Sequence, residues 1–509
     1  MFATKHSYDL VVIGGGPAGI IGAVTAATLG RSVALVDSHA GLGGAGVNTG
    51  TVPSKTLRET ALALSGMRSR NLHGVDLSLR REATVTDFLR HERNVKAGLN
   101  TLLAQRLGAS NAVRYCGTGS FVDSHTIRVQ RGPGEEETYL RAEHFLIATG
   151  SAPIRPPMFP FGSRGIYDSD TILALDRLPE TLAVAGAGVI GSEYACTFAA
   201  LGTRVHLIAG RDLLLPFLDA EVSQALAAAM ASAGIEFHRN ERAETCRAGA
   251  DGITLTLSSG RVLRIDAVLV AAGRKSNVES LNLRAAGVTA NERGLIQTDE
   301  YFRTQTPHIY AAGDVIGFPA LASTSMQQAR LATKHAFGQE ILSHAFRLLP
   351  TGVFTIPEVG MAGETEESLQ RQGVEYVVGR GPYQATARGR IIGDMDGFLK
   401  LLFRRHDMKL LGVHAIGEQA TELVHIGMIA MLTNSAAALF DEACFNLPTL
   451  GELYRLATLD AFSRVRHGHS LFERSERPDS CFTQSPPDPA MVVGCLLGSK
   501  GESNGSRVC

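Results

Sequence analysis

The residues from Gly43 to Lys55, "GGAGVNTGTVPSK", follow a nucleotide-binding pattern, at a place where an enzyme of this layout would carry its reactive group. The stretch contains glycines, small polar residues and one lysine, but no cysteine, histidine or carboxylate. It therefore offers no thiol nucleophile, and no histidine or carboxylate to transfer a proton. The chemistry that such a loop can support depends on the elements around it.

A dinucleotide-binding pattern precedes this loop. An apolar run predicts a buried parallel strand, which leads into the motif Gly14-x-Gly16-x-x-Gly19, a helical stretch and a second strand ending at Asp37. In such a motif the first glycine allows a tight turn, the second lets a pyrophosphate approach, and the third lets helix and strand pack closely. The helix N-terminus would bind the phosphates, and Asp37 would accept a ribose hydroxyl.

The same pattern recurs in "LAVAGAGVIGSEYACTFAALGTRVHLIAGRD", with glycines at Gly186, Gly188 and Gly191. Two such folds in one chain predict two bound dinucleotides. The second copy ends its strand at Ala209 instead of an acid, and Arg211 follows. Because an acid repels a 2′-phosphate and an arginine can pair with one, we expect this site to accept NADP(H). That Arg211 is only a solvated side chain stays an open alternative.

Three further apolar strands break at a glycine, in "HFLIATG", "VLVAAGR" and "IYAAGD". Ligands collect beyond the carboxyl ends of strands in open α/β sheets. We therefore expect these strand ends to return to the cofactors at Gly150, Gly273, Gly313 and Asp314.

From about Tyr8 to Arg466 the arrangement resembles the pyridine nucleotide–disulfide oxidoreductases. The resemblance implies FAD at the first glycine motif, NAD(P) at the second, and contact of the Gly313-Asp314 pair with the flavin ribityl chain. The corresponding loop in that family, "GGTCLNVGCIPSK", carries a redox disulfide over the flavin. Here Gly46 and Thr51 occupy the two cysteine positions.

This sequence keeps the two glycines that begin the family's loop, Gly43 and Gly44, and we expect them to bind the cofactor. The family's C-terminal "HPTxSE" reads "LPTLGE", so that Leu447 replaces the histidine and Glu452 is kept. Without the cysteines and the histidine base, electrons cannot pass to a substrate through a mixed disulfide. Both losses point to one abandoned half-reaction.

The resemblance further implies an ion pair of Lys55 and Glu193 beside the flavin, which leaves hydride exchange with a nicotinamide as the retained chemistry. The branch of the family that fits best is the soluble, Si-specific NAD(P)+ transhydrogenases, which catalyse NADPH + NAD+ = NADP+ + NADH. A flavin NAD(P)H:quinone reductase (a diaphorase) remains an alternative. A non-catalytic nucleotide redox sensor is an alternative of another class.

The composition and the lengths of the apolar segments limit the partners, the location and the metal sites that we expect for this protein. Lys plus Arg (49) nearly balances Asp plus Glu (50), which predicts no nucleic-acid partner. No apolar run approaches the about 20 residues of a membrane span, and the N-terminus leaves no room for a signal peptide, so we expect a cytoplasmic protein. The seven cysteines form no CxxC and no His/Cys cluster, which predicts no metal site.

The chain of 509 residues is long enough for about three domains. We expect an α/β protein with two Rossmann-like dinucleotide-binding domains, for FAD and NAD(P), and a C-terminal α+β dimerisation domain. By resemblance this domain would form a homodimer or a higher homo-oligomer. The predicted segments are 1–152 (FAD-binding, first part), 153–272 (NAD(P)-binding), 273–346 (FAD-binding, second part), 347–466 (dimerisation) and 467–509 (a disordered tail).

Two groups of residues receive no role. His414 and His425 lie in apolar stretches, where a lone histidine is usually a satisfied core residue. The tail cysteines Cys481, Cys495 and Cys509 would depend on electrons from the missing core disulfide.

Overall fold

The computed structural model describes residues 5–66, 84–132, 137–250, 252–341 and 348–472. The tail beyond residue 472, with its three cysteines and its predicted disorder, lies outside the described residues. Among the helices of the described part, none is long and apolar enough to cross a membrane.

The first sheet combines early and late parts of the chain. In the described residues it has seven strands in the order β3-β2-β1-β6-β5-β4, with β17 paired to β6. Their bounds are Lys5–Ile13 (β1), Val33–Asp37 (β2), Val113–Cys116 (β3), Thr118–Asp123 (β4), Thr126–Gln130 (β5), Thr138–Ile147 (β6) and Ile309–Ala311 (β17). Since β1, β2, β3, β6 and β17 pair in parallel, their carboxyl ends meet at one edge.

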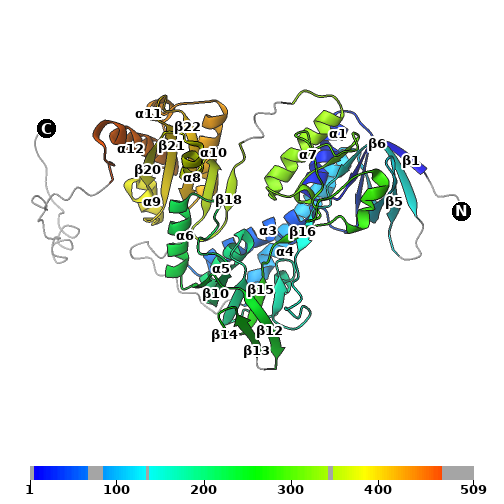
Figure 1. Ribbon diagram of the computed structural model, residues 1–509, viewed down its shortest axis with the longest axis horizontal. Helices are drawn as coiled ribbons and strands as arrows, with labels where there is room; N and C mark the ends of the chain where they lie inside the picture. The colour runs from blue at the N-terminus through cyan, green and yellow to red at the C-terminus, as the bar shows by residue number, and fades with distance from the viewer. Residues whose placement is uncertain (1–4, 67–83, 133–136, 251, 342–347, 473–509) are drawn as a thin grey trace, which may run out of the picture. The chain divides into compact units, whose positions relative to one another are not determined.

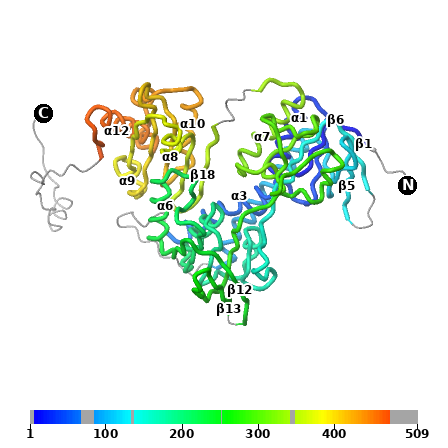
Figure 2. Tube along the Cα trace, in the orientation of Figure 1, coloured from blue at the N-terminus to red at the C-terminus, as the bar shows by residue number. Residues whose placement is uncertain are grey.

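Two helices far apart in the sequence, α1 (Pro17–Thr28) and α7 (Ala322–Ala336), lie side by side against this sheet (Figure 1). Figure 2 follows the return of the chain to this early sheet at α7. Glycine allows α1 to pack closely on the sheet, because a Cβ on Gly22 would lie only 2.3 Å from the side chain of Leu146 on β6. The other helices of this region are α2 (Gly44–Asn48), α3 (Thr51–Leu64) and α4 (Val85–Ala109).

The second sheet is parallel, in the order β11-β10-β9-β15-β8. Its strands are Ile166–Asp168 (β8), Thr181–Ala185 (β9), Arg204–Ala209 (β10), Glu236–Arg239 (β11) and Ala267–Val270 (β15). Helices α5 (Val189–Ala200) and α6 (Ala220–Ser232) share a core with one set of alternate side chains, such as Leu207. The other set, including Ile208, packs against the antiparallel strands β12 (Ala243–Gly249), β13 (Gly252–Leu257) and β14 (Val262–Ile265).

A short antiparallel pair, β7 (Ser151–Pro153) with β16 (Arg274–Ser276), joins the segments that run between the two parallel sheets. Short 3-10 turns complete the connections: Ile172–Ala174 (η2), Glu279–Leu281 (η3), Leu283–Ala286 (η4), Asp314–Ile316 (η5), Tyr383–Ala385 (η7) and Leu450–Glu452 (η8).

The third sheet is antiparallel, in the order β18-β19-β22-β21-β20. Its strands are Thr351–Val353 (β18), Val359–Gly363 (β19), Tyr376–Pro382 (β20), Phe398–Arg404 (β21) and Leu410–Ile416 (β22). Its helices are Glu366–Gln372 (α8), Ala387–Ile392 (α9), Ala420–Leu432 (α10), Ala438–Glu442 (α11) and Leu453–His467 (α12). Side chains of β21, β22, α10 and α12 share one apolar core.

The two histidines without a role differ in burial. His414 is 1% exposed, and its Nε2 lies 2.9 Å from the carbonyl oxygen of Glu364, as expected for a core histidine. His425 is exposed on α10, so the expectation of a core position is wrong there. The helix is apolar on more than its core-facing side, since Ile426 and Ile429 are also exposed.

A buried ion cluster ties the third sheet to α6. The Nζ of Lys400, 1% exposed on β21, lies 2.8 Å from Asp219 Oδ1 and 2.9 Å from Glu221 Oε2, and it also contacts Glu366. Three carboxylates around one ammonium satisfy a charge that would otherwise be costly to bury.

Candidate functional site

The first glycine loop follows β1 and opens α1. Gly14 has φ +111°, and a Cβ there would meet the carbonyl oxygen of Ala148 at 2.3 Å, so a side chain is excluded. A Cβ on Gly19 would lie 1.7 Å from the Gly14 carbonyl oxygen, which explains the close packing of helix on strand. At Gly16 the nearest heavy atom to such a Cβ is 3.9 Å away. This open space at the helix N-terminus fits a pyrophosphate.

Asp37 at the end of β2 faces this loop. Its side chain is 8% exposed, and its carboxylate accepts hydrogen bonds from the backbone N–H of Gly15 and, at 2.7 Å, of His39. These two bonds fix the carboxylate at the edge of the sheet, where a ribose of a dinucleotide would lie.

Three more strand-end residues gather at the same edge. Gly150 follows β6 with φ +69°, and Gly313 follows β17 with φ +83° and donates its N–H to Gln328 at 2.8 Å. The next residue, Asp314, accepts a hydrogen bond from the Ser151 hydroxyl at 2.6 Å. The carboxylate is therefore held between the two strand ends that the sequence analysis selected.

The loop from Gly43 to Lys55 folds as α2 and the start of α3, next to the first glycine loop. Gly43 and Gly44 both have positive φ, and a Cβ on Gly44 would lie 2.8 Å from the Cα of Gly16. Gly46 is also confined, because a Cβ there would meet the ring of Pro17 at 2.7 Å. Thr51 begins α3 and is exposed. Gly46, the first of the two positions at which the resemblance implies a cysteine, thus lies against the start of α1.

Lys55 and Glu193 come together where α3 packs against α5. The Nζ of Lys55 donates to both carboxylate oxygens of Glu193, at 2.9 Å and 2.7 Å. Glu193 also accepts from the Phe354 N–H at 3.0 Å and from the Ser54 hydroxyl at 3.4 Å. Its side chain is 5% exposed, whereas that of Lys55 is 25% exposed. One buried carboxylate therefore joins three separate segments and leaves the lysine ammonium partly accessible.

The second glycine loop repeats the geometry of the first. Gly186 has φ +116°, and a Cβ there would meet the Ala271 carbonyl oxygen at 2.4 Å. A Cβ on Gly191 would lie 1.8 Å from the Gly186 carbonyl oxygen, while Gly188 has no heavy atom within 4 Å of that position. Gly273, with φ +103°, accepts the N–H of Ile154 at 3.0 Å beyond the end of β15. Here too the helix N-terminus is open to a phosphate.

A pocket of about 440 Å³ lies beside this loop and is lined by Gly188, Ala209, Arg211 and a residue that the sequence analysis missed, Arg242. Arg242 comes shortly after β11, whose carboxyl end lies next to that of β10. Within the described residues neither guanidinium forms an ion pair. Two cations beside an uncharged strand end suit a 2′-phosphate.

The C-terminal motif residues lie in the third domain, which is the region from residue 348 to residue 472 that contains the third sheet. Leu447 is 72% exposed, and Glu452 has one buried carboxylate oxygen without a hydrogen-bond partner among the described residues. The described cysteines Cys116, Cys196, Cys246 and Cys444 are free thiols. Burial raises the pKa of Cys196 to about 12, which leaves that thiol protonated and unreactive at neutral pH.

Comparison with known proteins agrees with this geometry. Residues 8–335 match the family "Pyridine nucleotide-disulphide oxidoreductase", and residues 349–458 match its dimerisation domain. The soluble pyridine nucleotide transhydrogenase of Mycobacterium bovis (strain BCG / Pasteur 1173P2) is 43% identical over 461 residues, which cover 91% of this chain and 98% of the relative. That of Pseudomonas putida (strain W619) is 40% identical over 471 residues, with coverages of 90% and 99%.

Solved structures share the fold. LpdA from Mycobacterium tuberculosis superposes with a TM-score of 0.82 at 26% identity, covering 90% of this chain and 99% of that one. The HOCl-induced flavoprotein disulfide reductase RclA from Escherichia coli superposes with a TM-score of 0.80 at 27% identity, with coverages of 90% and 100%.

These matches confirm the predicted resemblance and the predicted α/β fold class with a C-terminal dimerisation domain. They also confirm the predicted enzyme class, an oxidoreductase with FAD as cofactor and pyridine nucleotides as substrates. The chain belongs to the pyridine nucleotide-disulphide oxidoreductase family.

Proposed function

We propose that the protein is an FAD-dependent, Si-specific transhydrogenase that transfers a hydride between NADPH and NAD+ without a redox disulfide. The carrying observation is the Lys55–Glu193 pair, retained next to a loop whose cysteine positions hold Gly46 and Thr51. The relatives at 38–43% identity that are named soluble pyridine nucleotide transhydrogenases support the same reaction.

The residues of the first site divide the work of holding FAD. The glycine loop would bind the pyrophosphate at the N-terminus of α1, and Asp37 would bind the adenosine ribose. By the family resemblance, Asp314 would contact the ribityl chain. When bound, FAD supplies the group that accepts a hydride from one nicotinamide and gives it to the next. Lys55 places a positive charge near that group and stabilises negative charge on it, while Glu193 holds the lysine in position.

The second site binds the two nicotinamide nucleotides in turn. Ala209 carries no charge, so the strand end accepts a ribose with a free 2′-hydroxyl or with a 2′-phosphate. Arg211 and Arg242 line the same pocket and favour the phosphate.

The test mixes purified holoenzyme with NADPH and a thionicotinamide analogue of NAD+, and follows formation of the reduced analogue. We expect steady analogue reduction in proportion to enzyme concentration. Faster electron transfer to a quinone than to the analogue would make the protein a quinone reductase instead. If neither acceptor oxidised NADPH, the protein would be a nucleotide sensor and the proposal would fail.

The loop composition gives a spectroscopic prediction. Anaerobic reduction with dithionite, which leaves no nicotinamide beside the flavin, is expected to produce no long-wavelength thiolate-to-flavin charge-transfer absorbance, because positions 46 and 51 carry no sulfur. Thr51→Cys is the matched comparison, since it introduces one thiol at an exposed residue of the loop. A band that appears in the wild-type protein would contradict the disulfide-free mechanism.

We further propose that the protein is a cytoplasmic homodimer formed through the third domain. The domain match and the "soluble" in the names of the relatives support this assignment. Exposed apolar side chains on α10, α11, α12 and the segment before α12 would be covered in such a dimer: Ile426, Ile429, Leu439, Leu447, Leu459 and Val465.

Ile429→Arg is expected to raise the dimer dissociation constant at least about 100-fold, because a symmetric interface takes up the buried charge twice. Analytical ultracentrifugation measures the change. Val262→Arg on β14 is the control, since Val262 has the same exposed fraction, 54%, on a different domain. If both variants dissociated equally, or if neither dissociated, the dimer interface would not include Ile429.

A further inference from the structure

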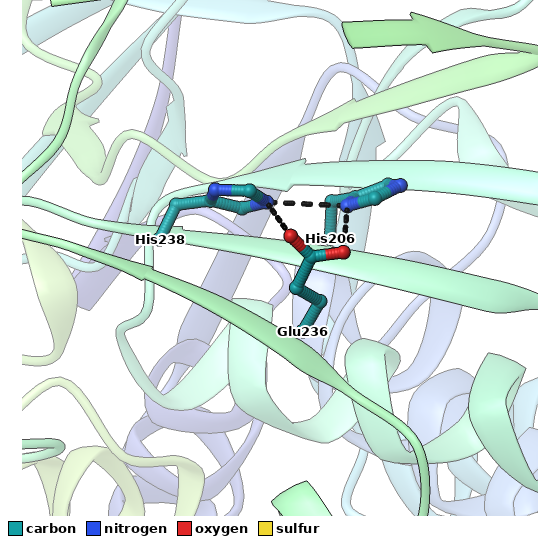
Figure 3. Close-up of side chains that lie close together, drawn as sticks. All are labelled: His206, Glu236 and His238. Atoms are coloured by element: carbon teal, nitrogen blue, oxygen red, sulfur yellow. Dashed lines mark hydrogen bonds and ion pairs between the residues drawn. The ribbon is translucent and has the colours of Figure 1, made fainter. Parts of the chain in front are cut away.

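Three potential metal ligands converge on the solvent-facing edge of the second sheet: His206 from β10, and Glu236 and His238 from β11 (Figure 3). The two strands are parallel neighbours, with His206 paired to Glu236 and Ile208 paired to His238. Since alternate residues of a strand share a face, all three side chains project to the same side. This is the side covered by the strands β12, β13 and β14, because Ile208 belongs to that core.

The distances within this cluster are close to those of a coordination shell. His206 Nδ1 lies 3.1 Å from His238 Nε2 and 3.2 Å from Glu236 Oε2, and His238 Nε2 lies 3.5 Å from Glu236 Oε1. Nitrogen and oxygen ligands about 2.0–2.2 Å from a tetrahedral zinc ion lie about 3.3–3.6 Å from one another. Two of the three contacts would therefore have to lengthen by only a few tenths of an ångström to admit one ion at the centre.

A cation would also complete the contacts within the cluster, because each of the three side chains turns a potential ligand atom toward the other two. One proton can form a hydrogen bond between only two of these side chains. A divalent ion can bind a nitrogen of His206, a nitrogen of His238 and an oxygen of Glu236 at the same time.

The cluster combines a fixed ligand with access from solvent. The side chain of His238 is 2% exposed, that of His206 is 21% exposed and that of Glu236 is 54% exposed. An ion can enter from the Glu236 side, where a water can complete the tetrahedron. The competing cation there is Arg261, whose Nη1 lies 3.4 Å from Glu236 Oε1 and whose side chain is 57% exposed.

We propose that His206, Glu236 and His238 bind one zinc ion, with water as the fourth ligand, on the nucleotide-binding sheet and outside the hydride-transfer site. Two imidazoles, one carboxylate and a water form a donor set that zinc uses in proteins. The ion would fasten β10 to β11. Ala209, which lines the nucleotide pocket, stands three residues after His206.

Asp219, Glu221 and Glu366 form a second cluster of potential metal ligands among the described residues, but this cluster has no room for a metal ion. Its centre holds the ammonium group of Lys400, which already neutralises it.

The experiment titrates chelator-treated holoenzyme with zinc sulfate and measures binding by calorimetry. We expect one zinc ion per chain with a dissociation constant below about 10 μM, and a higher melting temperature with zinc. His206→Gln and Glu236→Gln, both at partly exposed positions, are expected to weaken binding at least about 100-fold and about 10-fold respectively. Wild-type protein that binds no zinc, or variants that bind it as tightly as the wild type, would overturn the proposal.

Two further variants sharpen the result. His125→Gln is the matched control, because His125 stacks on His308 at 4.0 Å in another histidine pair, and it is expected to leave zinc affinity unchanged. Arg261→Ala is expected to tighten binding by about two- to five-fold, since it releases Glu236 from a partly exposed ion pair. Unchanged or weaker binding in Arg261→Ala would contradict the role given to Glu236.

Discussion

Replacing Lys55 with methionine is expected to lower the rate of NADPH-dependent hydride transfer about 100-fold, while the protein keeps its FAD. The change removes the ammonium group that lies 2.7 Å and 2.9 Å from the oxygens of Glu193, but retains most of the side-chain volume. In the proposed site the glycine loop and the strand ends of the first sheet hold FAD, so the FAD content should not change. Stopped-flow absorbance gives the rate, and the absorbance of the purified protein gives the FAD content.

The same change is expected to cost about 3 kcal/mol of stability, because the Glu193 carboxylate is left in a buried position without its cation. The Phe354 N–H and the Ser54 hydroxyl still donate to it and limit the loss. Thermal unfolding of the holoenzyme measures this effect separately from the rate.

A second substitution separates the two roles of the ion pair. In Lys55→Met/Glu193→Gln the neutral amide still accepts from Phe354, so most of the lost stability should return while the rate stays low. If the double variant recovered the rate together with the stability, Lys55 would be a structural residue and its proposed electrostatic role would be wrong.

The sequence predicts the structure best at positions where the local backbone conformation permits only one residue type. Gly14 and Gly186 need positive φ, and Gly19 and Gly191 need the absence of a Cβ against the preceding turn. Such constraints involve residues close in the sequence, so a short motif predicts the strand, the turn and the helix together. This is why both dinucleotide folds could be predicted without coordinates.

Contacts between distant segments could not be predicted in the same way. Arg242 reaches the pocket of Ala209 only because β11 lies beside β10, and His206 meets Glu236 and His238 through the register of those strands. No spacing in the sequence encodes that register. One contact between distant segments was predicted from the family resemblance, namely the ion pair of Lys55 and Glu193, which lie 138 positions apart.

The error at His425 has a related cause. An apolar helix was expected to place its histidine in the core, but α10 exposes His425, Ile426 and Ile429 together. Apolar character on an outer face arises when a partner covers it, and a single sequence does not distinguish the core of one chain from an interface.

Ala209→Glu is expected to weaken NADPH binding by about 1–3 kcal/mol, or roughly 5- to 150-fold, while NADH binding holds or improves. Ala209 is 7% exposed at the end of β10 and lines the pocket of about 440 Å³, so a longer side chain would extend into the space beside Arg211 and Arg242. The new carboxylate would repel a 2′-phosphate, pair with the arginines and accept a free 2′-hydroxyl. Transhydrogenation should then collapse because one of its two substrates is excluded.

Three variants test whether charge is the cause. Ala209→Gln has nearly the same size as the glutamate variant and no charge, so NADPH binding should stay within a few-fold of the wild type. Arg211→Ala and Arg242→Ala should each weaken NADPH but not NADH, because each removes one cation from the phosphate side of the pocket. Steady-state KM values for both nucleotides measure the discrimination. If the glutamine variant lost NADPH as strongly as the glutamate variant, the end of β10 would select by size and not by charge. If NADPH binding were unchanged in both arginine variants, the arginines would have no part in recognising the phosphate.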